Sequence, residues 1–146
     1  MKWVTRKQIR VNRVATAWLI RRFIDPQAEF IFVAPDQVAK VQTRQGAKGF
    51  DAPGATYPHK DAHGRCSFEA LVDEHCANDP VLKQIALIVR GADFPEEIDS
   101  TKESAGVRAI SHGFPLVAKD DAETVEKASF LYDALYAGLH AELRQR

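Results

Sequence analysis

Residues 11–33 read VNRVATAWLIRRFIDPQAEFIFV, and this stretch sets the fold class because it predicts a helix followed directly by a strand. At about 100° per residue, the first half places its apolar side chains on one broad arc. Asp25-Pro26 stops the helix, since proline cannot continue it. Residues 28–34 are rich in β-branched and aromatic side chains, which favours a strand. We expect a helix from an N-cap at Asn12 to Ile24, and then a strand.

Helical patterns dominate the rest of the chain. Residues 2–5 predict a short strand, while residues 45–64 carry four glycines and two prolines and predict a long loop with a short strand at 55–57. The predicted helices cover 35–43, 67–75 with Ser67 as N-cap, 79–90 with Gly91 at the C′ position, 101–111 and 121–143. The expected fold is therefore α+β: a predominantly helical single domain, residues 1–146, with a small sheet of two or three short strands.

Composition narrows the functional classes. The 146 residues are 45% hydrophobic and 27% charged, with 20 basic and 20 acidic residues, so the formal net charge is zero. This balance argues against a general nucleic-acid or anionic-membrane surface. A chain of this length buries a core without needing a disulfide or a structural metal. A metal ion in this domain is therefore expected to be functional.

The start of the chain indicates where the protein works. MKWVTRKQIRV has scattered charges and no apolar stretch typical of a signal peptide, and no run approaches the roughly 20 apolar residues of a membrane span. Cys66 and Cys76 bracket the predicted helix at 67–75, which separates them by about 15 Å and excludes a disulfide between them. We expect a cytoplasmic protein with two reduced thiols.

Residues 59–69, HKDAHGRCSFE, concentrate the chemistry of the chain. His59, His63, Cys66 and Glu69 offer imidazole, thiolate and carboxylate ligands for a divalent metal ion such as zinc, iron or manganese. More distant ligands can come from Asp51, Asp93 and His112. The alternative is structural: Ser67 caps a helix with Glu69 in its first turn, Cys66 is a small core residue, and both histidines are exposed. The sequence leaves both readings open.

Arginines near the first helix raise a second question. Arg22 falls inside the apolar arc, so either its stem reaches to the surface or its guanidinium pairs with a carboxylate or an oxyanion. Asp93 and Asp133 are candidate carboxylate partners. Arg10, Arg13 and Arg21 fall on a narrower stripe nearby, which can attract an anion or simply face water.

A family resemblance rests on several of these segments together. The string at 11–33, followed by GFDAPGATYPH, CSFEAL, IVRGAD and YDALYAGL, resembles the C-terminal domain of the chromate resistance protein B family, also called the chromate resistance exported protein family. The resemblance implies a role in chromate resistance or its regulation. The family usually has aspartate where this chain has Asn12, and Cys-Pro where it has Thr16-Ala17, so a role of that aspartate is in question here.

Three functional hypotheses follow. The first is a metal-dependent enzyme or redox protein with His59, His63, Cys66 and Glu69 at the metal and Arg22 and Glu69 in catalysis. The second is a module that binds a small oxyanion such as chromate through Arg13, Arg21 and Arg22. The third is a helical interaction domain that forms a homodimer or binds another protein.

Overall fold

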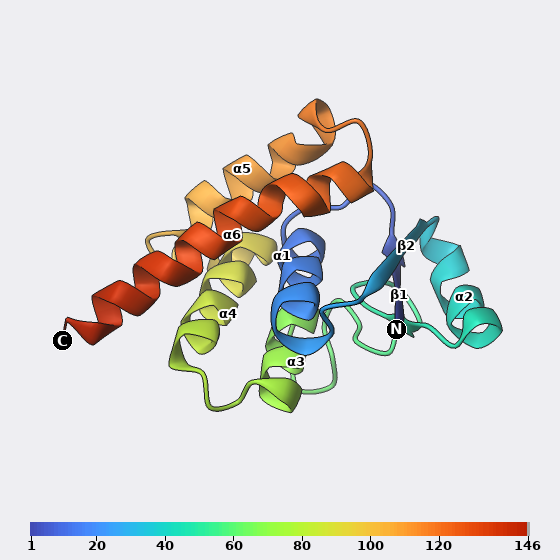
Figure 1. The fold of residues 1–146 in the computed structure, drawn as a ribbon, viewed down its shortest axis with the longest axis horizontal. Helices are drawn as coiled ribbons and strands as arrows, with labels where there is room; N and C mark the ends of the chain where they lie inside the picture. The colour runs from blue at the N-terminus through green and yellow to red at the C-terminus, as the bar shows by residue number, and fades with distance from the viewer. Residues whose placement is uncertain (146) are drawn as a thin grey trace.

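A computed structural model describes residues 1–145, which form a small parallel sheet packed among helices (Figure 1). The strands are β1 (Lys2–Arg6), β2 (Glu29–Val33) and β3 (Lys48–Gly49). The six α-helices of the described part are α1 (Asn12–Leu19), α2 (Val38–Gln45), α3 (Ser67–His75), α4 (Pro80–Asp93), α5 (Ser104–Val117) and α6 (Asp121–Arg144). Shorter helical turns cover Ile20–Ile24, Pro35–Gln37 and Pro95–Glu97. The expected α+β class, predominantly helical with a small sheet, is confirmed.

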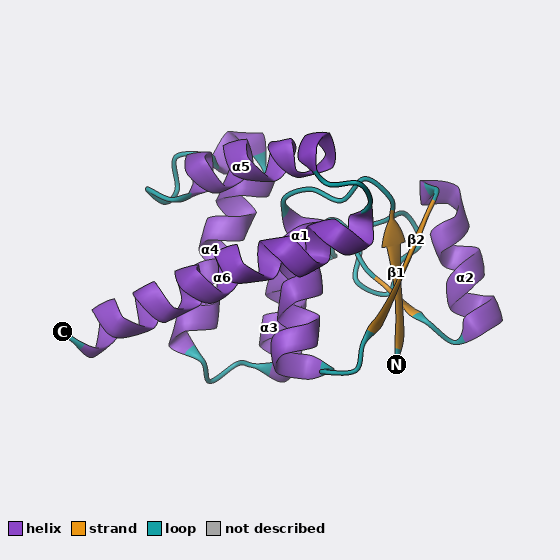
Figure 2. Cartoon of the chain, turned by 45° about the horizontal axis from the view of Figure 1, so that its top comes forward, coloured by secondary structure: helices purple, strands orange, loops and turns teal. Residues whose placement is uncertain are grey.

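The sheet has the order β2-β1-β3, and β1 runs parallel to both neighbours. Its alternating side chains serve two cores, because successive residues of a strand point to opposite faces. Trp3, Phe30 and Phe32 belong to the large core shared with the helices, whereas Val4 and Ile31 contact the smaller core under α2. Figure 2 shows α2 on the side of the sheet away from the other helices.

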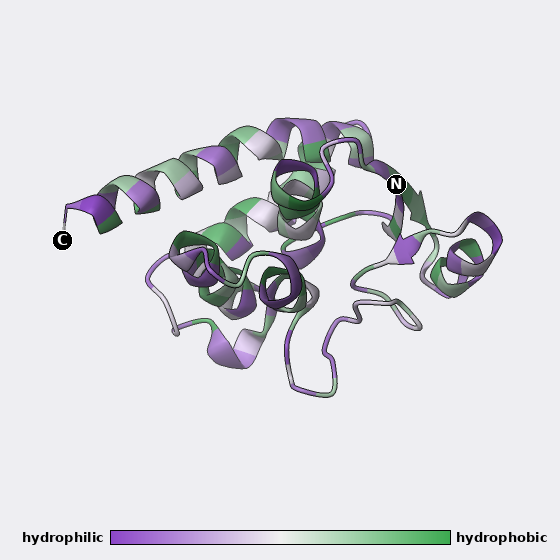
Figure 3. Cartoon of the chain, turned by 60° about the horizontal axis from the view of Figure 1, so that its bottom comes forward, coloured by the Kyte–Doolittle hydropathy of each residue, from purple (hydrophilic) through white to green (hydrophobic). Residues whose placement is uncertain are grey.

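The large core lies between α1 and the helices that follow β3. All of α1 is buried, and it packs against α3, α4 and α6. Trp18 of α1 packs against Tyr132 of α6, with ring centroids 5.6 Å apart and ring planes tilted by 30°. Along α6 the residues alternate between hydrophobic and hydrophilic, as Figure 3 shows, because only one side of this helix faces the core.

The loop between β1 and α1 has an unusual backbone and a specific partner. Gln8 and Val11 both adopt positive φ angles, 61° and 44°. The carboxylate of Asp121, the first residue of α6, accepts hydrogen bonds of 2.9 Å from the backbone N–H groups of Gln8 and Ile9. The N-terminal end of α6 therefore fixes the loop that leads into α1.

Several predicted boundaries differ from the structure. The first helix is α-helical only to Leu19 and continues as a π-helical turn to Ile24, and its N-cap position is Val11 instead of Asn12. The helix at 101–111 is displaced to 104–117. Gly91 does not end its helix, which continues to Asp93. The short strand lies at 48–49, and the segment at 55–57 contributes only a bridge between Phe50 and Tyr57.

Candidate functional site

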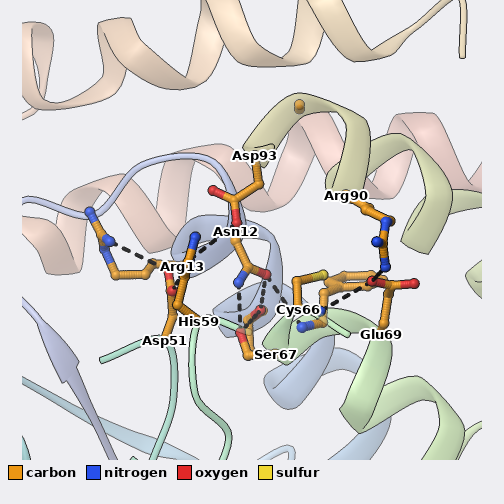
Figure 4. A network of polar contacts seen from close by, with 12 residues as sticks. Asn12, Arg13, Asp51, His59, Cys66, Ser67, Glu69, Arg90 and Asp93 are labelled. Atoms are coloured by element: carbon orange, nitrogen blue, oxygen red, sulfur yellow. Dashed lines mark hydrogen bonds and ion pairs between the residues drawn. The ribbon is translucent and has the colours of Figure 1, made fainter. Parts of the chain in front are cut away.

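Polar side chains converge where the parallel strands end. Arg6 ends β1, Asp51 follows β3, and Arg13 lies in the first turn of α1. The start of α3 and the end of α4, which carries Asp93, face the same region (Figure 4). Open parallel sheets bind ligands at the carboxyl ends of their strands, so this is the expected position for a site.

Asp51 is the centre of this cluster. It is 1% exposed and has a positive φ of 50°, a conformation that is rare outside glycine. Its carboxylate contacts Arg6 and Arg13 at 3.4 Å each and His59 Nδ1 at 2.8 Å. Arg6 Nε also donates to the backbone oxygen of Asp51 at 2.7 Å. Two buried or half-buried cations therefore fix the carboxylate that holds His59.

His59 presents its ring to solvent from this support. The side chain is 48% exposed, and the ring packs edge-on against Phe94 with centroids 5.3 Å apart. The hydrogen bond to Asp51 raises the pKa of the imidazole above its ordinary value. Because Asp51 holds Nδ1, Nε2 is the nitrogen left to meet a ligand or a proton.

Two buried polar atoms of the residues around Asp51 lack a hydrogen-bond partner among residues 1–145: Asp93 Oδ2 and Arg13 Nε. Asp93 Oδ2 lies 3.5 Å from His59 Nδ1. Burial, together with the nearby Asp51 charge, raises the pKa of the Asp93 carboxyl to about 6. Burial also lowers the pKa of the Arg13 guanidinium. Unsatisfied buried groups are uncommon in folded proteins, and their presence here indicates a functional site.

Asn12 connects the two helix starts that border the site. Its Nδ2 donates to Ser67 Oγ at 2.8 Å, and its Oδ1 accepts from Thr16 Oγ1 at 3.0 Å and from the backbone N–H of Phe68 at 3.3 Å. All these side-chain groups are buried. Asn12 thus joins the first turn of α1 to the first turn of α3.

Cys66 and Glu69 form a second group next to this one. The N-cap of α3 is Cys66, not Ser67 as predicted, and Glu69 Oε1 accepts from the Cys66 backbone N–H at 3.1 Å in a capping box. The same oxygen accepts from Arg90 at 3.0 Å. Cys66 is fully buried, and burial raises the pKa of its thiol.

The residues predicted as metal ligands are divided among different contacts. His59 bonds to Asp51, Glu69 to Arg90, Cys66 is enclosed in the core, and His63 is exposed on the loop. Within residues 1–145, no three His, Cys, Asp or Glu side chains are grouped so as to hold a metal ion. The four predicted ligands therefore do not fit a metal as one set in this conformation, and metal binding stays a prediction.

The predicted anion-binding arginines are also separated. Only Arg13 belongs to the Asp51 cluster. Arg21 donates to the backbone oxygen of Ala28 at 3.3 Å and lies over the Phe30 ring. Arg22 is exposed at the surface, where it lies 3.7 Å from Asp133. Of the two alternatives that the sequence left open for Arg22, the structure has the one in which its stem reaches to the surface. A pair in such contact with water contributes at most about 1 kcal/mol to stability.

The sequence reading missed the roles of Arg6 and Asp51. The sequence predicts Asp51 only as a distant metal ligand, whereas in the structure it organises the site. The sequence does carry a signal for this role: Asp51 lies in GFDAPG, two residues after Gly49, which is the last residue of the parallel strand β3.

The exclusion of a disulfide between Cys66 and Cys76 agrees with the structure, in which both cysteines are free. None of the helices formed by residues 1–145 is both long and apolar enough to cross a membrane.

Comparison with known proteins places the chain in a family. The family model described as "ChrB, C-terminal domain" matches residues 3–139. Protein ChrB of Cupriavidus metallidurans is 32% identical over 136 residues, which is 92% of this chain and 40% of that protein. The chain therefore spans less than half the length of this relative. No solved structure matches. The expected resemblance is confirmed, and the chain belongs to the family of ChrB C-terminal domains.

Proposed function

We propose that this domain binds a small oxyanion, such as chromate, at the cluster of Arg6, Arg13 and His59. The observation that carries the proposal is the arrangement around Asp51, which holds a half-exposed His59 beside the buried Arg13. Arg13 also has an Nε–H without a partner among residues 1–145. Planar guanidinium and imidazolium groups are the side-chain donors suited to oxyanions.

The charge of the cluster supports an anionic ligand. Arg6, Arg13 and a protonated His59 carry three positive charges, against two negative charges on Asp51 and Asp93. The raised pKa of His59 favours its protonated form. The first turns of α1 and α3, joined by Asn12, add the partial positive charge of two helix N-termini. An oxyanion beside His59 would offset this net positive charge.

Chromate is the first ligand to test because the family carries the name of chromate resistance. This is the second of the three hypotheses from the sequence, with Arg6 and His59 in place of Arg21 and Arg22. Binding needs no reaction, so the proposal covers both a sensor and the binding step of an enzyme.

The experiment is calorimetric titration with chromate, supported by thermal unfolding. A bound anion raises the unfolding free energy by about 2.7 kcal/mol at a concentration one hundred times its Kd. His59→Ala should weaken binding about tenfold or more, because a hydrogen bond to a charged group contributes about 1.5–3 kcal/mol. His63→Ala is the matched control, since this histidine lies on the same loop but is exposed outside the cluster. Equal loss in both variants, or no binding by the unaltered protein, would overturn the proposal.

The other expectations have separate tests. Elemental analysis of protein purified without a histidine tag decides whether zinc, iron or manganese is bound at stoichiometric levels. Sedimentation analysis tests the predicted homodimer, and cell fractionation tests the predicted cytoplasmic location.

A further inference from the structure

We infer that Asp93 makes this site prefer oxyanions that carry a proton, such as hydrogen phosphate or hydrogen chromate, over the fully deprotonated sulfate ion. The inference rests on the proposed function, because it specifies the class of anion that the same site takes. Its basis is the position of one carboxyl oxygen, Asp93 Oδ2, which is buried and without a hydrogen-bond partner among residues 1–145.

The groups that face Asp93 come from several elements. His59 and Asp51 lie on the loop after β3, Arg13 on α1, Arg6 on β1, and Cys66 at the start of α3. His59 Nδ1 is 2.8 Å from Asp51 and 3.5 Å from Asp93, so the imidazole hydrogen-bonds to Asp51 and leaves Asp93 Oδ2 with a longer ion-pair contact but no hydrogen bond. Figure 4 shows the Asp93 side chain extending from α4 toward His59 and Asn12.

The site therefore offers donors together with one free acceptor. Arg13 Nε–H donates, the outward nitrogen of His59 donates when the ring is protonated, and the Asp93 carboxylate accepts. A ligand satisfies both kinds of group only if it has negative oxygens and at least one O–H. Hydrogen phosphate and hydrogen chromate have both. Sulfate has no proton near neutral pH, so its oxygens would meet the Asp93 carboxylate as like charges.

The energetic difference is large enough to measure. An O–H donating to a carboxylate forms a short charge-assisted hydrogen bond, whereas two bare anionic oxygens leave the buried carboxylate unpaired and repelled. Such a difference between a made and an unmade charged hydrogen bond corresponds to about tenfold or more in affinity. Asp93 Oδ2 is itself covered, but it lies 3.5 Å from Nδ1 of the exposed His59 ring, so an anion that reaches His59 comes close to Asp93.

Calorimetric titration of the full chain with inorganic phosphate and with sulfate, slightly above neutral pH, tests the inference. The unaltered protein should bind phosphate about tenfold or more tightly than sulfate. Asp93→Asn replaces an acceptor by an amide that also donates, so the preference should disappear or turn toward sulfate. Asp133→Asn is the matched control: this carboxylate lies on α6, half exposed and paired with Arg22, and its loss should leave the ratio unchanged.

The outcomes separate the two proposals. If the unaltered protein binds phosphate and sulfate equally, the inference about Asp93 fails while oxyanion binding stands. A preference that persists in Asp93→Asn also overturns the role of Asp93. If the protein binds neither of these anions nor chromate, the proposed function and the inference fail together. The ratio in the unaltered protein decides the question even where the variant does not fold.

Discussion

Asp93 carries a carboxyl group in a position where burial opposes its charge. Its side chain is 13% exposed, and Oδ2 has no hydrogen-bond partner among residues 1–145, although it lies 3.5 Å from His59 Nδ1. The pKa of this group is about 6 in the folded protein, against an ordinary value of 3.8. A site that keeps such a group loses stability at neutral pH, which is typical of residues retained for binding or catalysis.

Asp93→Asn should therefore stabilise the protein in a pH-dependent way. The unfolded chain releases the Asp93 proton at lower pH than the folded protein, so charging this group destabilises the fold progressively between pH 3.8 and about 6. The amide has no charge to bury. Urea unfolding at a series of pH values should show equal stabilities below that range and an advantage of about 3 kcal/mol for the variant above it. A difference that is constant with pH would contradict this account.

The contacts of Asn12 show what an aspartate, which the family resemblance implies at this position, would preserve. Its side chain accepts from Thr16 and Phe68 and donates to Ser67. A carboxylate would keep both acceptor roles, and the Ser67 hydroxyl can turn to donate. Both helix starts also favour a negative charge at this place. The departure therefore preserves the connection between α1 and α3.

Two substitutions at this position should behave differently. Asn12→Asp should change the unfolding free energy by less than about 1 kcal/mol, whereas Asn12→Leu should lower it by about 1–3 kcal/mol because it leaves buried groups unpaired. Denaturant unfolding of both variants measures the effect. Equal losses would show that shape, and not hydrogen bonding, governs this position.

At the scale of elements, the segment that forms α1 and β2 shows why most helices and strands could be predicted from the sequence. Residues 11–33 carry a clear helical period followed by a β-rich run, and the structure has both elements there. The errors lie where tertiary contacts decide. Asn12 and Ser67 are typical capping residues, yet they bond to each other in the core, so Val11 and Cys66 occupy the cap positions.

Gly91 shows the same effect inside α4. Glycine favours helix ends, but here the helix continues past it to Asp93. A methyl group at this position would collide with Ser100 Oγ, Ser104 Oγ and the backbone oxygen of Glu97. The start of α5 therefore approaches α4 closely because residue 91 has no side chain. A sequence alone does not reveal such an approach.

Gly91→Ala should destabilise the protein although alanine is the better helix former. Helix propensity alone favours alanine by about 1 kcal/mol, whereas overpacking costs about 1–3 kcal/mol. Chemical denaturation should thus show a net loss. Gly138→Ala is the control, because its α6 position has nothing within 4 Å and should gain stability. A gain in both variants would mean that α5 moves away freely.

For the site, sequence reasoning found the chemistry but not its grouping. The sequence points to four residues of the cluster but under different hypotheses: His59, Arg13, Asp51 and Asp93. Asp51 and Asp93 lie 42 positions apart and meet only because β3 and α4 end at the same edge. Spacing along HKDAHGRCSFE suggested convergence of His59 with Cys66, but the loop turns His59 toward Asp51 while Cys66 enters the core.

At the scale of the whole molecule, the two cysteine thiols lie at different depths below the protein surface. Cys66 is buried with a raised thiol pKa, and Cys76 is half-buried at the end of α3. A thiol probe should label Cys76 in the folded protein and Cys66 only as the molecule opens. Peptide mapping by mass spectrometry, with Cys76→Ala as the control, distinguishes the sites. Faster labelling of Cys66 after a chelator is added would instead support metal ligation through this residue.

The hydrogen bonds from Gln8 and Ile9 to Asp121 connect the loop before α1 to the first turn of α6, although these segments lie far apart in the sequence. The segment they fix lies directly between Arg6 and Arg13, so α6 cannot shift at its first turn without disturbing the spacing of two site cations. If a protein bound along α6 changed the affinity for an anion, the anion would change the affinity for that protein by the same factor. One pair of backbone amides would then be enough to couple anion binding at the site to protein binding along α6 in both directions.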